Sequence, residues 1–359
     1  MLVFEPGEVM EIVQDTGGYV EAIVNYPNGE FNKAIGYKLL VGGIKPGVMV
    51  LCNRTAVSLG LGTGGIDFIL ANLAEPSFYR QAKGHIMKLR YTPLQFGVNT
   101  VEEQGSAFHH VFNEEMSLLG FPVVVGSLHS MLAPAVMGIY SSNRKLKCAY
   151  IMSDGGCLPL CFSKTAAKLK ASGLIAATIT YGHAFGGDYE AVNIFSALLA
   201  AKYCLDVDLA IVAMGPGIVG TGTLWGHTGI EQGEIANAVT ALAGIPVIVP
   251  RLTFGDHRDR HYGISHHTLT VLERVCNAQA TVVLPILSDE KHQVVMAKLN
   301  DKKLLDKHNF VTRDGKPALN LAEELQLHLT TMGRGIDQEN QYFEAAAAAG
   351  IFAAELVNL

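Results

Sequence analysis

The order of hydrophobic and polar residues divides the chain into two parts with different patterns. In the N-terminal part, short β-prone runs such as VMEIVQD and GYVEAIVNY alternate with turns that contain glycine. Asn28-Gly29 lies between two such runs, and this pair favours a tight hairpin because both residues tolerate positive φ. Several short strands at this spacing predict a small barrel. We therefore expect a β-rich, barrel-like domain over residues 1–95.

The second part alternates apolar runs with helical patterns, which predicts an α/β domain over residues 96–359. The nearly all-apolar runs are the expected strands, at residues 122–125, 148–152, 174–180, 209–214, 245–249 and 281–286. Helical patterns lie at residues 160–171, 190–205, 231–243, 266–276, 289–305, 319–330 and 337–357. This order predicts a doubly wound, mostly parallel sheet followed by C-terminal helices. We also expect a helix over Val101–Leu119 that links the two domains, and a polar linker over His308–Pro317.

Composition and charge narrow the class of protein. Hydrophobic residues make up 49% and charged residues 17% of the chain, so it can bury a sizeable core and is not of the disordered class. The net charge of −6 argues against a nucleic-acid partner. No apolar run approaches the ~20 residues that span a bilayer, so we expect no membrane partner. The mean hydropathy of +0.25 is compatible with a homo-oligomer.

The six cysteines indicate the cellular compartment. They are scattered along the sequence, and Cys148 and Cys204 lie inside apolar runs. Cys157 and Cys161 are close, but three residues separate them, which is not the spacing of a redox C-x-x-C pair. The sequence therefore predicts a cytoplasmic protein with reduced thiols.

Polar side chains and glycines gather directly after the predicted strands. The carboxyl ends of parallel strands share one edge of a sheet, and ligands bind beyond that edge. Histidine and aspartate there are typical of acid, base or nucleophilic chemistry. The candidate catalytic residues are His129, Asp154, His183, Asp188, Asp256 and His257. Two simpler roles remain open: the glycines permit tight turns, and Asp188 caps a following helix.

A glycine-rich loop follows the predicted strand 209–214. Gly215, Gly217 and Gly220 form a literal G-x-G-x-x-G, but no long helix begins at Gly220 and the next strand has no acidic residue at its end. A nicotinamide dinucleotide is therefore not the expected cofactor. Backbone amides and hydroxyls in this loop favour an anion instead. The expected anion-binding residues are Gly215, Gly217, Gly220, Thr221, Gly222, Thr223, Arg251 and Arg258.

The segment Asp256–His267 is the densest group of chemically active residues. Histidine and carboxylate are the mixed ligands of zinc or manganese sites, and arginine binds carboxylate or phosphate with two hydrogen bonds. The candidate metal ligands are Asp256, His257, His261, His266 and His267. The segment contains no H-E-x-x-H motif. A divalent metal site, an anion site without metal and a solvated loop all remain open for it.

Four motifs give the chain a resemblance to a known family. SDGGCLP, YGHAFGGDYEAVN, MGPGIVGTGT and DHRDRHYGISHHT resemble a bacterial family known as a domain of unknown function. The resemblance extends over nearly the whole chain and implies a cytoplasmic bacterial protein. It implies no particular activity and assigns no catalytic residue.

These observations favour an enzyme. We expect it to act on a small phosphorylated or carboxylated molecule, by hydrolysis or group transfer, at the carboxyl edge of the sheet. A divalent metal is a candidate cofactor. The alternative is a regulatory protein that binds a small ligand without turnover, and a third interpretation is a scaffold that assembles with itself.

Overall fold

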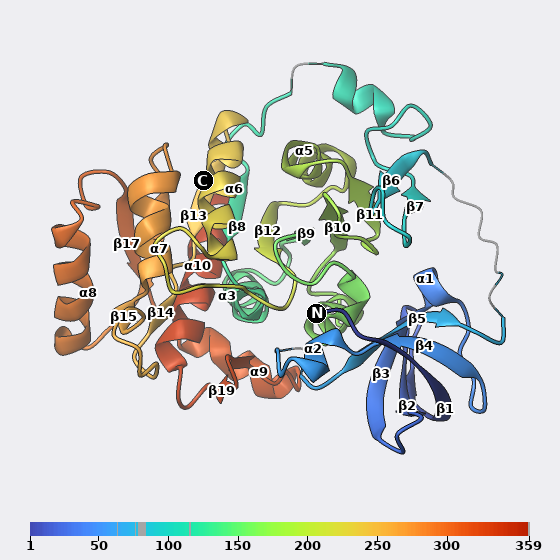
Figure 1. Ribbon diagram of the computed structural model, residues 1–359. Coiled ribbons are helices and arrows are strands. Elements are labelled where there is room, and N and C mark those ends of the chain that lie inside the picture. Colours follow the sequence, from blue (N-terminus) through green and yellow to red (C-terminus); the bar gives the residue numbers. More distant parts are fainter. Residues whose placement is uncertain (63, 76, 78–83, 115, 358–359) are drawn as a thin grey trace. The chain divides into compact units, whose positions relative to one another are not determined.

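The computed structural model describes residues 1–62, 64–75, 77, 84–114 and 116–357, and the chain forms two compact units (Figure 1). The smaller unit contains Met1–Lys83 and Leu89–Gly97, and the larger unit contains Gly84–Lys88 and Val98–Leu359. None of the helices within the described ranges is long and apolar enough to cross a membrane.

The smaller unit is a closed barrel with the strand order β1-β2-β3-β5-β4, which confirms the predicted barrel. The long first strand closes it, because Glu8 of β1 pairs with Asn25 of β2 on one side and with Met49 of β4 on the other. β3 and β5 run parallel, whereas the other pairs are antiparallel. This topology is that of the OB barrel, a scaffold that does not by itself define a function. The elements are β1 (Phe4–Asp15), β2 (Tyr19–Asn25), β3 (Phe31–Tyr37), α1 (Lys38–Val41), β4 (Met49–Asn53), α2 (Thr55–Ser58) and β5 (Asp67–Asn72).

The larger unit is built on an eight-stranded parallel sheet with the order β11-β10-β9-β12-β8-β13-β16-β17, as predicted. Strands β8, β9, β10 and β12 are buried at every position, which explains their continuous apolar runs. The strands are β8 (Pro122–Val125), β9 (Cys148–Ser153), β10 (Ala177–Tyr181), β11 (Tyr189–Ala191), β12 (Leu209–Met214), β13 (Ile245–Ile248), β16 (Thr281–Pro285) and β17 (Asn309–Arg313). Short strands outside this sheet are β6 (Ile86–Lys88), β7 (Phe96–Val98), β14 (Leu252–Thr253), β15 (Gly263–Ile264), β18 (Thr330–Thr331) and β19 (Arg334–Gly335).

Helices cover both faces of the sheet. Apolar side chains of α3, α4 and α10 form the core on one face, and those of α5, α6 and α8 form the core on the other. The α-helices are α3 (Leu132–Ser142), α4 (Lys164–Ala171), α5 (Ile194–Cys204), α6 (Glu231–Ala241), α7 (His266–Thr270), α8 (Asp289–Asp301), α9 (Leu321–Glu324) and α10 (Asn340–Val357). The other turns are the 3₁₀ segments η1 (His109–Asn113), η2 (His129–Met131), η3 (Leu160–Phe162), η4 (Thr228–Ile230) and η6 (Pro317–Asn320), and the π-helical turn η5 (Val271–Val275).

The strand order places a topological switch point between β12 and β8. The chain leaves β8 through α3 and reaches β9, whereas it leaves the neighbouring strand β12 through α6 and reaches β13. These two connections run over opposite faces, since α3 and α6 belong to different cores. Ligands of doubly wound sheets bind outside the carboxyl ends of the strands at such a point.

Four predicted elements differ from the structure. Of the helix expected over Val101–Leu119, the described residues form only the 3₁₀ turn η1, because Glu102 and Glu103 accept backbone N–H groups and hold this segment in turns. The helix predicted from residue 190 begins at Ile194, since the preceding residues pair with β10 as strand β11. The pattern over 319–330 gives only η6 and the short α9. The expected linker 308–317 contains the edge strand β17, and helix α3 was not predicted.

Helices α3 and α10 contact each other through two glycines. A Cβ on Gly138 of α3 would lie 2.0 Å from the Ala347 carbonyl oxygen, and one on Gly350 of α10 would lie 2.0 Å from that of Ala135. The two backbones therefore approach more closely than any larger residue allows. This contact fixes α10 against α3 on the face of the sheet that both helices cover (Figure 1).

We expect Gly138→Ala to destabilise the protein. The added methyl group forces the two helices apart, and overpacking of this kind costs about 1–3 kcal/mol, more than the ~1 kcal/mol that alanine contributes as a better helix former. Urea unfolding measures the change. Gly335→Ala is the control, because nothing lies within 4 Å of its added Cβ. Equal or greater stability of Gly138→Ala would contradict the close contact.

Candidate functional site

A small pocket lies beyond the carboxyl ends of β12 and β13. Its volume is about 130 Å³, which suits a group the size of a phosphate or a carboxylate. The lining is unusually basic for so small a space. It consists of Ile218, Val219, Gly220, Gly222, Arg251, Arg258, Arg260, His261, His267 and Met332. The loops after β12 and β13, two strands separated in the sheet by β8, thus converge on one positively charged pocket.

Arg251 is the most deeply buried charge of this pocket, with 4% of the residue exposed. Among the residues that the structure describes, its guanidinium makes only long contacts: Nη1 lies 3.4 Å from Nδ1 of His267, and Nη2 lies 3.9 Å from Oδ2 of Asp256. Burial lowers the pKa of Arg251, but a guanidinium remains charged at any physiological pH. A buried arginine without a close partner is well placed to receive an anion.

Asp256 holds the arginines of the pocket together. Its carboxylate accepts hydrogen bonds from Nε and Nη2 of Arg258 at 2.8 and 2.6 Å. Nη2 of Arg334 lies 3.4 Å from Oδ2, and Nε of the same arginine donates to Glu339 at 2.6 Å. Arg258 holds the pKa of Asp256 well below its usual range. Asp256 is therefore an ionised counter-charge for the arginines. The arginines occupy both of its carboxylate oxygens, which a metal would need.

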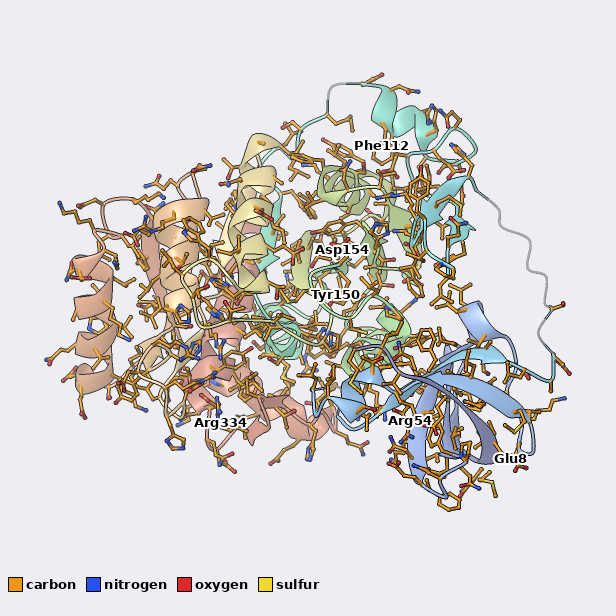
Figure 2. All side chains as sticks on the ribbon, in the orientation of Figure 1. Glu8, Arg54, Phe112, Tyr150, Asp154 and Arg334 are labelled. Atoms are coloured by element: carbon orange, nitrogen blue, oxygen red, sulfur yellow. The ribbon has the colours of Figure 1, made fainter. Side chains whose placement is uncertain are left out.

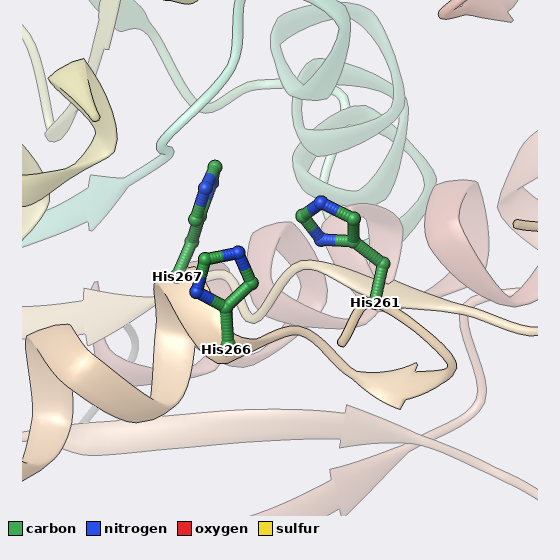
Figure 3. A group of neighbouring side chains, drawn as sticks. All are labelled: His261, His266 and His267. Carbon is green, nitrogen blue, oxygen red and sulfur yellow. The ribbon is translucent and has the colours of Figure 1, made fainter. Parts of the chain in front are cut away.

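Four histidines lie beside these arginines. The rings of His227 and His267 stack with centroids 3.8 Å apart and planes 8° apart. His266 lies 4.4 Å from His267 and 4.9 Å from His261, between centroids (Figure 3). Three of the four, His261, His266 and His267, present ligand atoms within 4.8 Å of one another. The structure thus brings together three of the five predicted metal ligands, while Asp256 pairs with arginine and His257 is exposed on the loop.

The histidines are neutral at physiological pH. Burial is the main cause of their lowered pKa values, and the nearby arginine charges lower them further. The pKa falls to about 3 for His261, to about 4 for His266 and to about 2 for His267. The pKa of His227 is also lowered by burial, although the Leu224 carbonyl opposes this in part. Imidazoles with such low pKa values are weak proton acceptors near neutral pH, but their free lone pairs can accept a hydrogen bond or bind a metal.

The glycine-rich loop supplies part of the pocket wall. Gly220 and Gly222 line the pocket, whereas the Thr221 and Thr223 hydroxyls bond to each other at 2.9 Å and to the backbone of Gly226. The loop after β12 therefore offers the pocket its backbone rather than its hydroxyls. The earlier glycines serve packing and turning: an added Cβ on Gly215 would lie 2.2 Å from the Cys157 carbonyl oxygen, and Gly217 has φ of +101°.

A second group of polar residues lies at the carboxyl ends of β9 and β10. Glu231, the first residue of α6, accepts a hydrogen bond from the Tyr181 hydroxyl at 3.2 Å. Burial raises the pKa of Glu231 to about 7, although the Ser153 and Tyr181 hydroxyls oppose the shift. Gly155 makes room for this carboxyl, because an added Cβ would lie 2.4 Å from Oε2. Glu231 is thus a carboxyl group that carries its proton up to neutral pH.

The exposed carboxylate of Asp154 belongs to the same edge (Figure 2). Its Oδ2 accepts the backbone N–H of His183 at 2.9 Å, and an added Cβ on Gly182 would lie 2.3 Å from that oxygen. Asp154 therefore fixes the loop that carries His183. The structure leaves these two predicted catalytic residues next to each other but gives them no place in the basic pocket.

Two other predicted catalytic residues take part in internal networks. His129 lies between the Ser163 hydroxyl, 2.8 Å from Nε2, and the Tyr150 hydroxyl, 3.2 Å from Nδ1, and burial lowers its pKa to about 4. Ser163 is itself buried and caps α4. Asp188 accepts the backbone N–H and the hydroxyl of Thr178, each at 2.9 Å. It does not cap α5, which Asn193 caps. Through these contacts, His129 and Asp188 hold neighbouring loops in place.

Sequence reasoning missed four residues of the two groups: His227, Glu231, Arg334 and Glu339. His227 follows the same strand as the glycine-rich loop, so its position at a strand end was a usable signal. Glu231 stands at the start of a predicted helix, where an acidic residue needs no further explanation. Arg334 and Glu339 come from the segment before α10, far along the sequence from any parallel strand end (Figure 2). Only the tertiary structure brings them to Asp256.

Comparisons with known proteins give a family and no activity. The family model described as "Protein of unknown function (DUF3866)" matches residues 33–350, which confirms the resemblance of the four motifs. No curated protein and no solved structure matches the chain. An assignment of function therefore depends on the chemistry of the residues described above.

Glu231 leads to a prediction on the pH dependence of stability. The pKa of Glu231 is about 7 in the folded protein, above the ordinary glutamate value of 4.5. The free energy of unfolding therefore falls as the pH rises from 4.5 to 7. Glu231→Gln cannot ionise, so we expect it to gain on the order of 2 kcal/mol over the wild type between pH 5 and pH 8.5. Urea unfolding at both pH values measures this. Glu290→Gln, an exposed first-turn residue of α8, is the control. A pH-independent difference between Glu231→Gln and the wild type would refute the buried proton.

Proposed function

Because the chain belongs to the DUF3866 family of proteins of unknown function, we propose its activity from the site alone. The protein is an enzyme that hydrolyses, or transfers a group from, a small phosphorylated or carboxylated molecule. The reaction takes place in the basic pocket beyond the carboxyl ends of β12 and β13.

The observation that carries this proposal is the buried charge of Arg251. It lines the pocket with Arg258 and Arg260, and neither of its own contacts is shorter than 3.4 Å. Desolvating a guanidinium is costly, and a close oxyanion in the pocket repays that cost through charge-assisted hydrogen bonds. The small volume selects a compact anionic group rather than a large ligand.

The histidines supply the chemistry that distinguishes an enzyme from a binding protein. His261 and His267 line the same pocket as the arginines, and their neutral imidazoles can orient a water molecule, or bind a metal ion that activates one, beside the bound anion. The arginines stabilise the charge that develops on the oxygens of a phosphoryl or carboxyl group in the transition state. Imidazoles that can position water beside a bound anion favour an enzyme over a protein that only binds the anion.

The remaining expectations about context are also proposals. We place the protein in the cytoplasm, in keeping with six cysteines that are all free. Its expected partner is a small molecule rather than a nucleic acid or a membrane, and a homo-oligomer is compatible with its composition. A dinucleotide is not the proposed ligand, because no long helix begins at Gly220 to receive a pyrophosphate group.

The test uses Arg260, which is exposed and lines the pocket. We expect inorganic phosphate or malonate to bind the wild type in calorimetric titrations, and Arg260→Ala to bind it 10- to 100-fold more weakly, the effect of one charge-assisted hydrogen bond. Arg144→Ala is the control, because Arg144 is exposed at the end of α3 and lies outside the pocket. A panel of small phosphate esters and carboxylic esters then tests turnover, with the same variants.

The outcomes separate the hypotheses. Turnover that falls at least tenfold in Arg260→Ala and not in Arg144→Ala supports the enzyme. Anion binding without turnover on any member of the panel supports the regulatory ligand-binding protein instead. Equal anion binding by the wild type and Arg260→Ala would remove the pocket from consideration altogether.

A further inference from the structure

We propose that His261, His266 and His267 bind a divalent metal ion of the zinc type, and that they bind it together with an oxyanion held by the arginines of the pocket. The inference rests on the proposed function, since it assigns a metal to the anion site. It replaces the five-residue set expected from the sequence with three histidines and adds a coupling between the two ligands.

The three imidazoles have a suitable arrangement for a metal. His261 precedes β15, and His266 and His267 are the first two residues of α7. Their ligand atoms lie within 4.8 Å of one another, whereas nitrogens about 2.0–2.1 Å from one tetrahedral zinc ion are about 3.4 Å apart. Binding one ion therefore requires the three rings, which Figure 3 shows side by side, to rotate toward one another. Three histidines leave the fourth position for water or substrate, as in catalytic zinc sites.

Unused nitrogens point to the same ligand. The Nε2 atom of His266 is buried and has no hydrogen-bond partner among the residues that the structure describes. Nδ1 of His261 lies 2.7 Å from the Ser265 hydroxyl, which leaves Nε2 of that ring for a metal. A hydrogen bond on the second ring nitrogen is the usual support of a metal-binding histidine, because it fixes the tautomer.

The third histidine couples the metal to the anion. Nη1 of Arg251 lies 3.4 Å from Nδ1 of His267, and because arginine only donates, Nδ1 accepts in this contact. If the metal binds Nε2, the ring proton moves to Nδ1, which can then no longer accept from Arg251. If the metal binds Nδ1, it uses the lone pair that accepts from Arg251. Either way the contact with Arg251 is lost. Metal binding therefore releases the Arg251 guanidinium to hold an oxyanion in the pocket.

Charge makes the coupling necessary. Arg251, Arg258, Arg260 and Arg334 face two carboxylates, those of Asp256 and Glu339, so four positive charges against two negative ones leave a net of two. A divalent ion beside this surplus is repelled, and an anion that enters with it offsets the repulsion. By linkage, an anion that strengthens metal binding is itself bound more tightly by the same factor when the metal is present.

The test is a titration of the metal-free protein with Co²⁺, followed by its visible absorption, with and without inorganic phosphate. We expect binding at one site and at least tenfold tighter binding with phosphate. His266→Ala and His261→Gln should each weaken Co²⁺ binding at least tenfold, with circular dichroism as the check of folding. His292→Ala, an exposed residue of α8, is the matched control and should bind as the wild type does.

A further variant, Arg260→Ala, tests the coupling between Co²⁺ and phosphate binding. Arg260→Ala should bind Co²⁺ more tightly than the wild type without phosphate, because it removes one repelling charge, and should lose most of the phosphate effect. Equal Co²⁺ binding by the wild type and both histidine variants would overturn the metal site, even where phosphate still binds the metal-free protein and the proposed function stands. Co²⁺ binding that phosphate leaves unchanged would overturn the coupling. Absence of phosphate binding to the metal-free protein, with Co²⁺ bound by the histidines, counts against the arginine pocket of the proposed function instead.

Discussion

A parallel sheet that is buried on both faces can carry polar chemistry only where its strands end. The central strands β8, β9, β10 and β12 have no exposed position, and helices from two separate cores close both faces. Charged groups must therefore collect beyond the carboxyl edge, in loops that the strands hold in place. The strand order decides which loops meet. It places β12, β8 and β13 side by side, so the loops after β12 and β13 share one pocket although helix α6 separates them in sequence.

Within that edge the charges are arranged around a single carboxylate. Asp256 lies close to three arginines, and one of them is paired with a second acid, Glu339. Without Asp256, like charges would repel one another across a small pocket. The arrangement neutralises Arg258 and Arg334 more fully than Arg251, which keeps only long contacts. The surplus positive charge is thus concentrated on the wall that faces the histidines.

Periodicity predicts the sheet well because its strands are continuous apolar runs, and β8 and β12 have the predicted bounds. It fails where a side chain is fixed by distant backbone, as Glu102 in the expected linking helix is by the N–H of Val192. The site divides in the same way. The positions of His261, His266 and His267 after a strand could be recognised, but their separation from Asp256 and His257 could not, because it depends on where Arg258 and Arg334 lie. Pairings between segments that are far apart in the sequence leave no local pattern.

The close contact between α3 and α10 also bears on how the chain acquires this structure during synthesis. Helix α3 leaves the ribosome early, and its glycine-lined face has no partner until α10 follows near the other end of the described chain. Until then, the part of this face that α10 covers, over β8, β13 and β16, remains open to water. Arg334 and Glu339 emerge just before α10, so the ion pair that contacts Asp256 arrives with the helix that closes the core. A nascent chain halted before that point has its strands and its histidines, but neither a fully covered sheet nor the contact of Arg334 with Asp256.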